Sequence, residues 1–220
     1  DEEYKNLGVN LSDNEEEIIK NSNIVIQLGL PVEEKLSFLK ENQTLIGSLN
    51  TNVNKEKLEN LKKNKIINKI GCSVYDKIEI DHIKKFSFDN LQIPINIIDQ
   101  RLLDSGTLEG VKKNNIEIYA RSIFLQGLLL NPNQHLPNKI FPLKSYILSF
   151  NKKAQYLNVS NIELALNFVR SIDLVSKCIV GVQNYNQFNE IIKIPFKKIN
   201  INDFKSFRCD NNQLLDPRNW

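Results

Sequence analysis

Four short apolar runs in the later two-thirds of the sequence each end in small or polar residues that could contact a ligand. These ends lie at Ser73, Gln92, Arg121 and Gly181, and segments with helical periodicity separate them. Parallel strands that alternate with helices bring their carboxyl ends to one edge of a sheet, where α/β proteins bind small molecules. A hydroxyl, an amide and a guanidinium group can all form hydrogen bonds with such a ligand. The pattern therefore predicts a ligand site at the strand ends.

The elements that would position these residues alternate between strand and helix, so the expected fold class is α/β. Serines at 12 and 160 are predicted N-caps because a Glu follows each by three residues, and Pro94 must end or shift its strand. A closed (β/α)8 barrel needs eight strands and about 250 residues, so this chain is about two units short. We expect strands at 24–30, 44–49, 70–74, 91–95, 116–124 and 177–182, and helices at 12–20, 32–40, 55–63, 78–86, 107–114, 143–157, 160–170 and 185–193.

The composition is that of an ordinary globular protein and excludes several function classes. Apolar residues make up 41% and charged residues 25% of the 220 residues, and the net charge is +3 without a basic stripe, so we expect no nucleic-acid partner. No apolar run approaches the ~20 residues of a membrane helix, and the acidic N-terminus lacks signal-peptide character. Three cysteines without metal-type spacing suggest reduced thiols and a cytoplasmic location. Since the sequence contains no Met, we expect it to be processed or part of something longer.

Residues 58–220 resemble the aldo/keto reductase family throughout. The resemblance implies the last four βα units of a (β/α)8 TIM barrel, preceded by a short α/β segment. It also implies an oxidoreductase that reduces an aldehyde or ketone with NADPH or NADH. The segments that carry it, in the family's order, are Lys-Ile-Gly-Cys-Ser-Val-Tyr at 69–75, Gln-Ile-Pro-Ile-Asn at 92–96, Arg-Ser-Ile-Phe-Leu-Gln-Gly at 121–127, Glu-Leu-Ala-Leu-Asn-Phe-Val at 163–169 and Leu-Asp-Pro-Arg-Asn-Trp at 215–220.

The same resemblance implies which residues hold the cofactor. Ser73 and Gln92 would bind the nicotinamide carboxamide, and Arg121 stands where many relatives stack an aromatic ring on the nicotinamide. The choice between NADPH and NADH stays open because no basic residue occupies the usual adenosine-phosphate position, and Ile191 replaces a frequent Asn. The remaining predicted contacts are Ser122, Leu125 and Gly127 at the pyrophosphate, Gly181 and Val182 beside the phosphates, and Gln187 and Glu190 at the adenosine. In the alternative interpretation, the glycines are tight turns and the polar residues merely line a barrel mouth.

The family's catalytic Asp, Tyr, Lys and His come from the first four strands, which the matched region lacks. We therefore assign no catalytic residue. Tyr75 is better explained by packing, and His82 and His135 by surface or loop positions. Asp99 and Asp104 flank Arg101, and a local salt bridge explains this group more simply than catalysis.

Residues 1–66 resemble a different family, the N-terminal domain shared by alanine dehydrogenase and the alpha subunit of nicotinamide nucleotide transhydrogenase. Segments 17–31 and 39–50 carry this likeness. Gly29 and Asn50 stand where alanine dehydrogenase has a substrate Lys and a His, so the transhydrogenase branch fits better. The two resemblances overlap at residues 57–66, which suggests a chimera of two domains, 1–66 and 67–220. A divergent reductase with a shortened first half is the alternative.

Three functions follow from these observations. The first is a reductase of small carbonyl compounds, impaired because the catalytic half is absent. The second is a non-catalytic truncated or chimeric half-barrel module that could self-associate through its open sheet edges. The third is a transhydrogenase-like fragment, although the sequence contains no Gly-x-Gly-x-x-Gly fingerprint.

Overall fold

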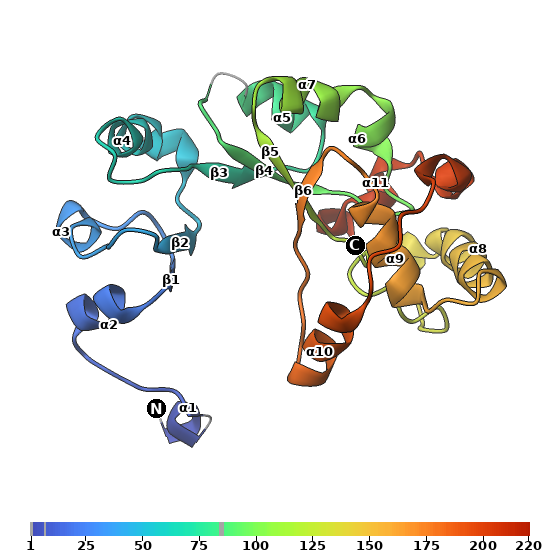
Figure 1. Cartoon of the computed structure of the whole chain (residues 1–220), viewed down its shortest axis with the longest axis horizontal. Coiled ribbons are helices and arrows are strands. Elements are labelled where there is room, and N and C mark those ends of the chain that lie inside the picture. Colours follow the sequence, from blue (N-terminus) through green and yellow to red (C-terminus); the bar gives the residue numbers. More distant parts are fainter. Residues whose placement is uncertain (1, 7, 84–85) are drawn as a thin grey trace. The chain divides into compact units, whose positions relative to one another are not determined.

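The computed structural model describes residues 2–6, 8–83 and 86–220, and these form two compact units, 1–66 and 67–220 (Figure 1). The first unit contains a two-stranded parallel sheet, in which Ile24 pairs with Thr44 and Gln27 with Gly47. Its elements are α1 (Glu2–Asn6), α2 (Glu15–Asn21), β1 (Ile24–Gln27), α3 (Glu33–Leu36), β2 (Thr44–Gly47) and α4 (Thr51–Lys63).

The predicted elements of the first unit are present but mostly shorter than expected. Helix α4 buries Leu58 and Leu61, the two residues predicted to face inward. Strand β1 ends at Gln27 rather than residue 30, and Gly29 adopts the left-handed region at φ +86°. The predicted cap at Ser12 is wrong: the N-cap of α2 is Asn14, whose Oδ1 accepts a hydrogen bond from the backbone N–H of Glu17 at 3.1 Å.

The second unit is built on a four-stranded, all-parallel sheet in the order β3-β4-β5-β6, which is also the order of the strands along the chain. Crossovers between parallel strands are almost always right-handed, so a sequential order carries every connecting helix to the same face of the sheet. The elements of this unit are β3 (Gly71–Ser73), α5 (Lys77–Ile83), β4 (Asn90–Pro94), α6 (Arg101–Asp104), α7 (Thr107–Lys113), β5 (Glu117–Arg121), η1 (Asn138–Ile140), α8 (Leu143–Tyr156), α9 (Asn161–Arg170), β6 (Val175–Cys178), α10 (Tyr185–Lys193), η2 (Ile201–Phe207), α11 (Asn212–Leu215) and η3 (Pro217–Asn219).

The core of this unit lies on the face of the sheet that the helices cover. Alternate residues of β4 and β5, including Leu91, Ile93, Ile118 and Ala120, are fully buried and pack against helix residues such as Phe168. The residues between them are half-buried, so burial alternates along all of β5 and along β4 as far as Ile93, whereas Pro94 at the end of β4 is buried as well. One face of the sheet is therefore apolar and covered, and the opposite face carries the polar side chains.

Several predicted boundaries in this unit need correction. Strand β5 ends at Arg121 rather than residue 124 because Ser122 takes a positive φ of +56°. Strand β6 spans Val175–Cys178 instead of 177–182, because its register with β5 pairs Ile118 with Val175. Helix α6 and the short helices η2, α11 and η3 were not predicted, since none is long enough to show a periodic pattern. The end of the helix predicted at 78–86 lies partly outside the described residues.

Helices α9 and α10 match their predicted spans closely. Ser160 caps α9, with its Oγ accepting a hydrogen bond from the N–H of Glu163 at 3.1 Å, as the sequence predicts. In residues 2–6, 8–83 and 86–220, every helix is too short or too polar to span a bilayer.

Candidate functional site

Polar side chains from adjacent strands form a row across the face of the sheet opposite the helices. Ser73 pairs with Gln92, Gln92 with Tyr119, and Tyr119 with Lys177, so one row crosses β3, β4, β5 and β6. Arg121 projects from the same face as Tyr119, two residues nearer the carboxyl end of β5. The structure thus brings the predicted site residues Ser73, Gln92 and Arg121 to one face of the sheet, near the carboxyl ends of β3, β4 and β5.

The guanidinium group of Arg121 reaches across the sheet to the segment that follows β3. Its Nη2 donates to the carbonyl oxygen of Val74 at 3.2 Å, its Nη1 donates to Oγ of Ser122 at 3.4 Å, and its Cζ lies 4.2 Å from the centre of the Tyr75 ring. Its Nε is buried and has no hydrogen-bond partner among the described residues. A buried donor without an acceptor is uncommon in proteins, and a ligand oxygen would satisfy it.

Tyr75 also contacts a second guanidinium group, which comes from the C-terminal end of the chain. Cζ of Arg218 lies 3.9 Å from the ring centre, and Nη1 of Arg218 donates to Oε1 of Glu79 at 3.0 Å. The other oxygen of Glu79 accepts the backbone N–H of Tyr75 at 2.6 Å. Arg218 also binds both carboxylate oxygens of Asp216 and holds the pKa of that carboxyl below its usual value. Tyr75 is therefore a packing residue, as the sequence predicts, and these contacts fix its position.

Buried polar side chains after β4 hold the loop that follows β5. Asn96 is fully buried; its Nδ2 donates to the carbonyl oxygen of Ser122 at 3.0 Å, and its Oδ1 accepts the N–H groups of Ile98 and Asp99 at 2.9 and 2.8 Å. Both oxygens of Asp99 bind Arg101, at 2.7 and 2.8 Å. This ion pair confirms the predicted local salt bridge for Asp99, whereas Asp104 binds the distant Arg208 at 2.6 Å. Burial raises the pKa of Asp99, and the two neighbouring cations Arg101 and Arg121 oppose that shift.

The segment from Ser122 to Gly127, the predicted pyrophosphate loop, has an unusual backbone. Ser122, Leu125, Gln126 and Gly127 all have positive φ, at +56°, +47°, +55° and +84°. Such conformations are costly for residues other than glycine and cluster at ligand sites. Leu125 is buried, and its N–H donates to the carbonyl oxygen of Ser122 at 2.9 Å. The side chain of Leu125 thus anchors the loop, while any contact it makes with a ligand would come from its backbone.

The other predicted contacts lie after β6, around the start of α10. Gly181, Val182, Gln187 and Glu190 are all exposed. Asn184 caps α10 by accepting the N–H of Gln187 at 3.0 Å, and Oε1 of Gln187 accepts the N–H of residue 183 at 2.8 Å. The amide of Gln187 is therefore used in the helix cap. Within the described part of the chain, no hydrogen bond or ion pair joins these four residues to Ser73, Gln92 or Arg121.

The polar face contains ionisable residues that the sequence analysis did not select. Tyr119 donates to Oε2 of Glu117 at 2.8 Å, and Lys69 binds the same oxygen at 3.1 Å. Hydrogen bonds from Tyr119 and Lys69 hold the pKa of Glu117 below its usual value. Lys177 places its Nζ 4.9 Å from the centre of the Tyr119 ring. The alternation of polar and apolar residues at 117–121 could have predicted these residues, because it is typical of a strand with one solvated face.

The histidine and cysteine side chains differ in their exposure. His82 and His135 are exposed, as expected. Cys72 and Cys178 are half-buried rather than fully buried, and burial raises the pKa of both thiols, that of Cys72 to about 12. Within the described ranges, no group of three or more His, Cys, Asp and Glu side chains could hold a metal ion.

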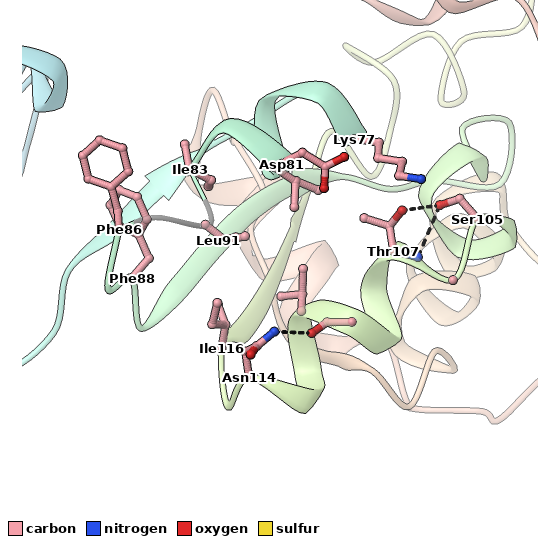
Figure 2. A pocket seen from close by; sticks show the side chains of 14 residues that line it. Lys77, Asp81, Ile83, Phe86, Phe88, Leu91, Ser105, Thr107, Asn114 and Ile116 are labelled. Atoms are coloured by element: carbon pink, nitrogen blue, oxygen red, sulfur yellow. Dashed lines mark hydrogen bonds between the residues drawn. The ribbon is translucent and has the colours of Figure 1, made fainter.

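A pocket of about 260 Å³ lies between α5 and α7 (Figure 2). Its lining includes Leu91 and Ile116, which belong to the apolar, helix-covered side of the sheet. Ser73 and Gln92 project from the opposite face. The pocket is therefore separate from the candidate site at the strand ends.

Comparisons with known protein families find matches for both parts of the chain. The family model described as "Aldo/keto reductase family" matches residues 54–209, and the model described as "Alanine dehydrogenase/PNT, N-terminal domain" matches residues 1–79. Both resemblances predicted from the sequence are confirmed. A search of curated protein sequences finds no match.

Several solved structures have a similar fold. An aldo-keto reductase from Bacillus halodurans in its holo form superposes with a TM-score of 0.57 at 14% identity, over 88% of this chain and 65% of that chain. The apo form gives 0.53 at 13% identity, over 87% and 82%. A glycerol dehydrogenase from Gluconobacter oxydans gives 0.55 at 15% identity, over 83% and 57%. These likenesses show an α/β fold with parallel strands similar to that of aldo-keto reductases. The chain spans less than two-thirds of the length of the first and third of these chains.

Proposed function

The chain belongs to the aldo/keto reductase family, and from this we propose that residues 67–220 form the nicotinamide-binding part of a carbonyl reductase. Its proposed cofactor is NADPH, with NADH as the alternative, and its proposed substrate is a small aldehyde or ketone. We further propose that the four strands of this unit are the last four staves of a (β/α)8 barrel. The sequential parallel order β3-β4-β5-β6 supports this, since each stave of such a barrel pairs with the next along the chain.

The observation that carries the proposal is the grouping of three side chains on the polar face of the sheet. Ser73 and Gln92 are neighbours across β3 and β4 and together offer a hydroxyl and an amide, which suit a carboxamide. Arg121 stands one step further toward the strand ends and has a buried, unpaired donor. A planar ligand with a carboxamide and adjacent oxygens fits these groups.

The loop after β5 extends this site toward a phosphate group. The positive φ values at Leu125, Gln126 and Gly127 give the loop a turned backbone, and turned backbones can form anion-binding concavities. Ser122 adds a hydroxyl at the start of the loop. In the proposed site, Gly181 and Val182 would lie beside the phosphates, near the N-terminal end of α10, and Gln187 and Glu190 would meet the adenosine.

We assign no catalytic residue, and we propose that this chain by itself reduces carbonyl compounds poorly. Tyr75 is held by two guanidinium groups and by Glu79, and both histidines are exposed. The proton donor of the reaction would have to come from outside residues 67–220. The overlap of the two family matches at residues 54–79 supports a join between two ancestral segments in this region.

Binding of NADPH and NADH to the full chain, followed by cofactor fluorescence, tests the proposal. We expect micromolar binding, and we expect Gln92→Leu to weaken it by about tenfold, since one hydrogen bond to the carboxamide is lost. The matched control is Gln213→Leu, because Gln213 is exposed in α11. Absence of binding would refute a cofactor site. Binding with aldehyde-dependent oxidation of NADPH would show an enzyme, and binding without turnover would show a site separated from its catalytic half.

A non-catalytic, self-associating half-barrel is the second candidate, and the sheet edges favour it. Strands β3 and β6 each pair on one side only, so two rows of backbone hydrogen-bonding groups are open. In the chain after β6, the exposed side of α10 carries Tyr185, Phe188 and Ile192. We expect a second copy of the chain to cover this region. Sedimentation velocity should show a dimer that Phe188→Glu dissociates, and a monomer at all concentrations would exclude this candidate.

A further inference from the structure

Three arginines lie near the strand ends, and they differ in their counter-charges. Arg101 binds Asp99 at 2.7 Å, and Arg218 binds Asp216 at 2.7 Å and Glu79 at 3.0 Å. Arg121 forms no salt bridge with the residues that the structure describes. Its contacts are a carbonyl oxygen, a hydroxyl group and an aromatic ring. Arg121 is thus the cation of the three that lacks a carboxylate of its own.

Asp99 does not form an ion pair with Arg121. Both of its oxygens bind Arg101, while its charge acts on Arg121 only at longer range. Among the described residues, Arg121 therefore has no carboxylate in direct contact with its guanidinium group. Because the Nε of Arg121 is buried, water screens the charge of this side chain less than it would on an exposed arginine.

The position of the Arg121 guanidinium group follows from its contacts. Arg121 belongs to β5, whereas Val74 and Tyr75 follow β3, and β4 lies between these two strands. The guanidinium group therefore crosses the carboxyl end of β4. Gln92 projects from β4 on the same face and pairs with Ser73. A nicotinamide whose carboxamide is bound by Ser73 and Gln92 would place its ring beside this cation.

We propose that Arg121 makes the site selective for the reduced form of the cofactor. The inference rests on the proposed function, since it requires a nicotinamide at Ser73 and Gln92. The oxidised ring carries a formal positive charge and the reduced ring is neutral, so only the oxidised form is repelled by a neighbouring guanidinium group that has no carboxylate bound to it. An aromatic side chain at this position would not impose such a penalty. The chain would then bind the reductant tightly and release the oxidised product readily.

The test compares the dissociation constants of NADPH and NADP⁺ for the full chain by calorimetry. We expect the wild-type chain to bind NADPH at least about tenfold more tightly than NADP⁺. Arg121→Gln removes the charge and should bring the ratio close to one, whereas Arg121→Lys keeps the charge and should preserve the preference. Arg170→Gln is the matched control, because it makes the same charge change at a residue that contacts Phe196 and the carbonyl oxygen of Ile194.

The outcomes separate this inference from the proposed function. Equal ratios in the wild-type chain and in Arg121→Gln, with both forms bound, would overturn the inference and leave the cofactor site intact. A parallel gain in affinity for both forms in Arg121→Gln would show that the side chain merely fills the ring's space, which also overturns it. Failure of every variant to bind either form would overturn the proposed function and this inference together. Fluorescence of the single tryptophan, Trp220, checks that each variant is folded.

Discussion

Replacing Asn96 tests whether its buried hydrogen bonds after β4 hold the candidate site together. The side chain makes three hydrogen bonds, at 3.0, 2.9 and 2.8 Å, to backbone groups of Ser122, Ile98 and Asp99. Asn96→Ala leaves the N–H groups of Ile98 and Asp99 without an acceptor in a buried environment, whereas the carbonyl oxygen of Ser122 keeps its hydrogen bond from the N–H of Leu125. At about 1 to 2 kcal/mol for each of these two unsatisfied groups, we expect the second unit to lose about 2 to 4 kcal/mol of stability. That is a large share of the 5 to 15 kcal/mol typical of a domain.

Urea unfolding followed by tryptophan fluorescence measures this loss directly. Trp220 is the only tryptophan in the sequence, and its Nε1 donates to the carbonyl oxygen of Leu214 at 3.0 Å, so its emission reports on the second unit. Asn96→Leu restores most of the volume without the hydrogen bonds and should be destabilised as strongly as the Ala variant. Asn219→Ala, at an exposed position, should change stability by less than about 0.5 kcal/mol. A loss below about 1 kcal/mol for Asn96→Ala would refute the reasoning.

Three further predictions concern other parts of the chain. Ser160→Ala removes the cap of α9 and should lower the stability of the second unit by about 1 kcal/mol in the same urea assay, with an unchanged midpoint counting against the cap. Because burial raises the pKa of Cys72 from 9.0 to about 12, its alkylation at pH 8, followed by mass spectrometry, should be on the order of a thousandfold slower in the folded chain than in urea. The folded state keeps this proton longer than the unfolded state, so the thiol leaves stability unaffected below about pH 8 and lowers it as pH rises from 9 toward 12. In Gly47→Ala, the new Cβ would lie 1.9 Å from the backbone oxygen of Gln27. Circular dichroism should therefore show a loss of structure in the first unit, while the unfolding transition reported by Trp220 stays in place. A shift of the Trp220 transition would contradict the expectation that the two units unfold separately.

Local signals in the sequence were sufficient to predict the elements that depend on local contacts. Helix α9 begins where Ser160 and Glu163 form a cap, and α10 spans the residues with amphipathic spacing. Both features are set within four residues, so no distant contact is needed to specify them. The cap of α2 was misplaced because Ser12 and Asn14 both precede a Glu-rich turn, and only the three-dimensional path shows which oxygen reaches the N–H of Glu17.

The boundaries of the strands and the contacts of the site depend on distant residues, and for this reason the sequence could not supply them. The most apolar part of the last run lies at 178–182, yet β6 begins at Val175 because pairing with Ile118 fixes its register. The contact of Arg121 with Tyr75 joins residues 46 positions apart, and that of Arg218 with Glu79 joins residues 139 positions apart. The family resemblance identifies Arg121 as a site residue. Only the structure shows that Asp99 binds Arg101 and that Arg121 has no carboxylate bound to it among the described residues.

The polar face of the second unit bears on whether two copies of this sheet could close into one barrel. Parallel sheets are usually covered on both faces, and their strands are then apolar throughout. Here Glu117, Tyr119 and Lys177 occupy the uncovered face, and Lys69 joins them through Glu117. If two copies closed into a barrel with a dry interior, Lys69, Lys177 and Glu117 would be removed from water. The attraction within a buried ion pair such as Lys69–Glu117 rarely offsets this desolvation cost. Side chains of this kind suit a face that stays hydrated or binds a polar ligand. This favours association through the apolar side of α10 over closure of two sheets around a dry interior.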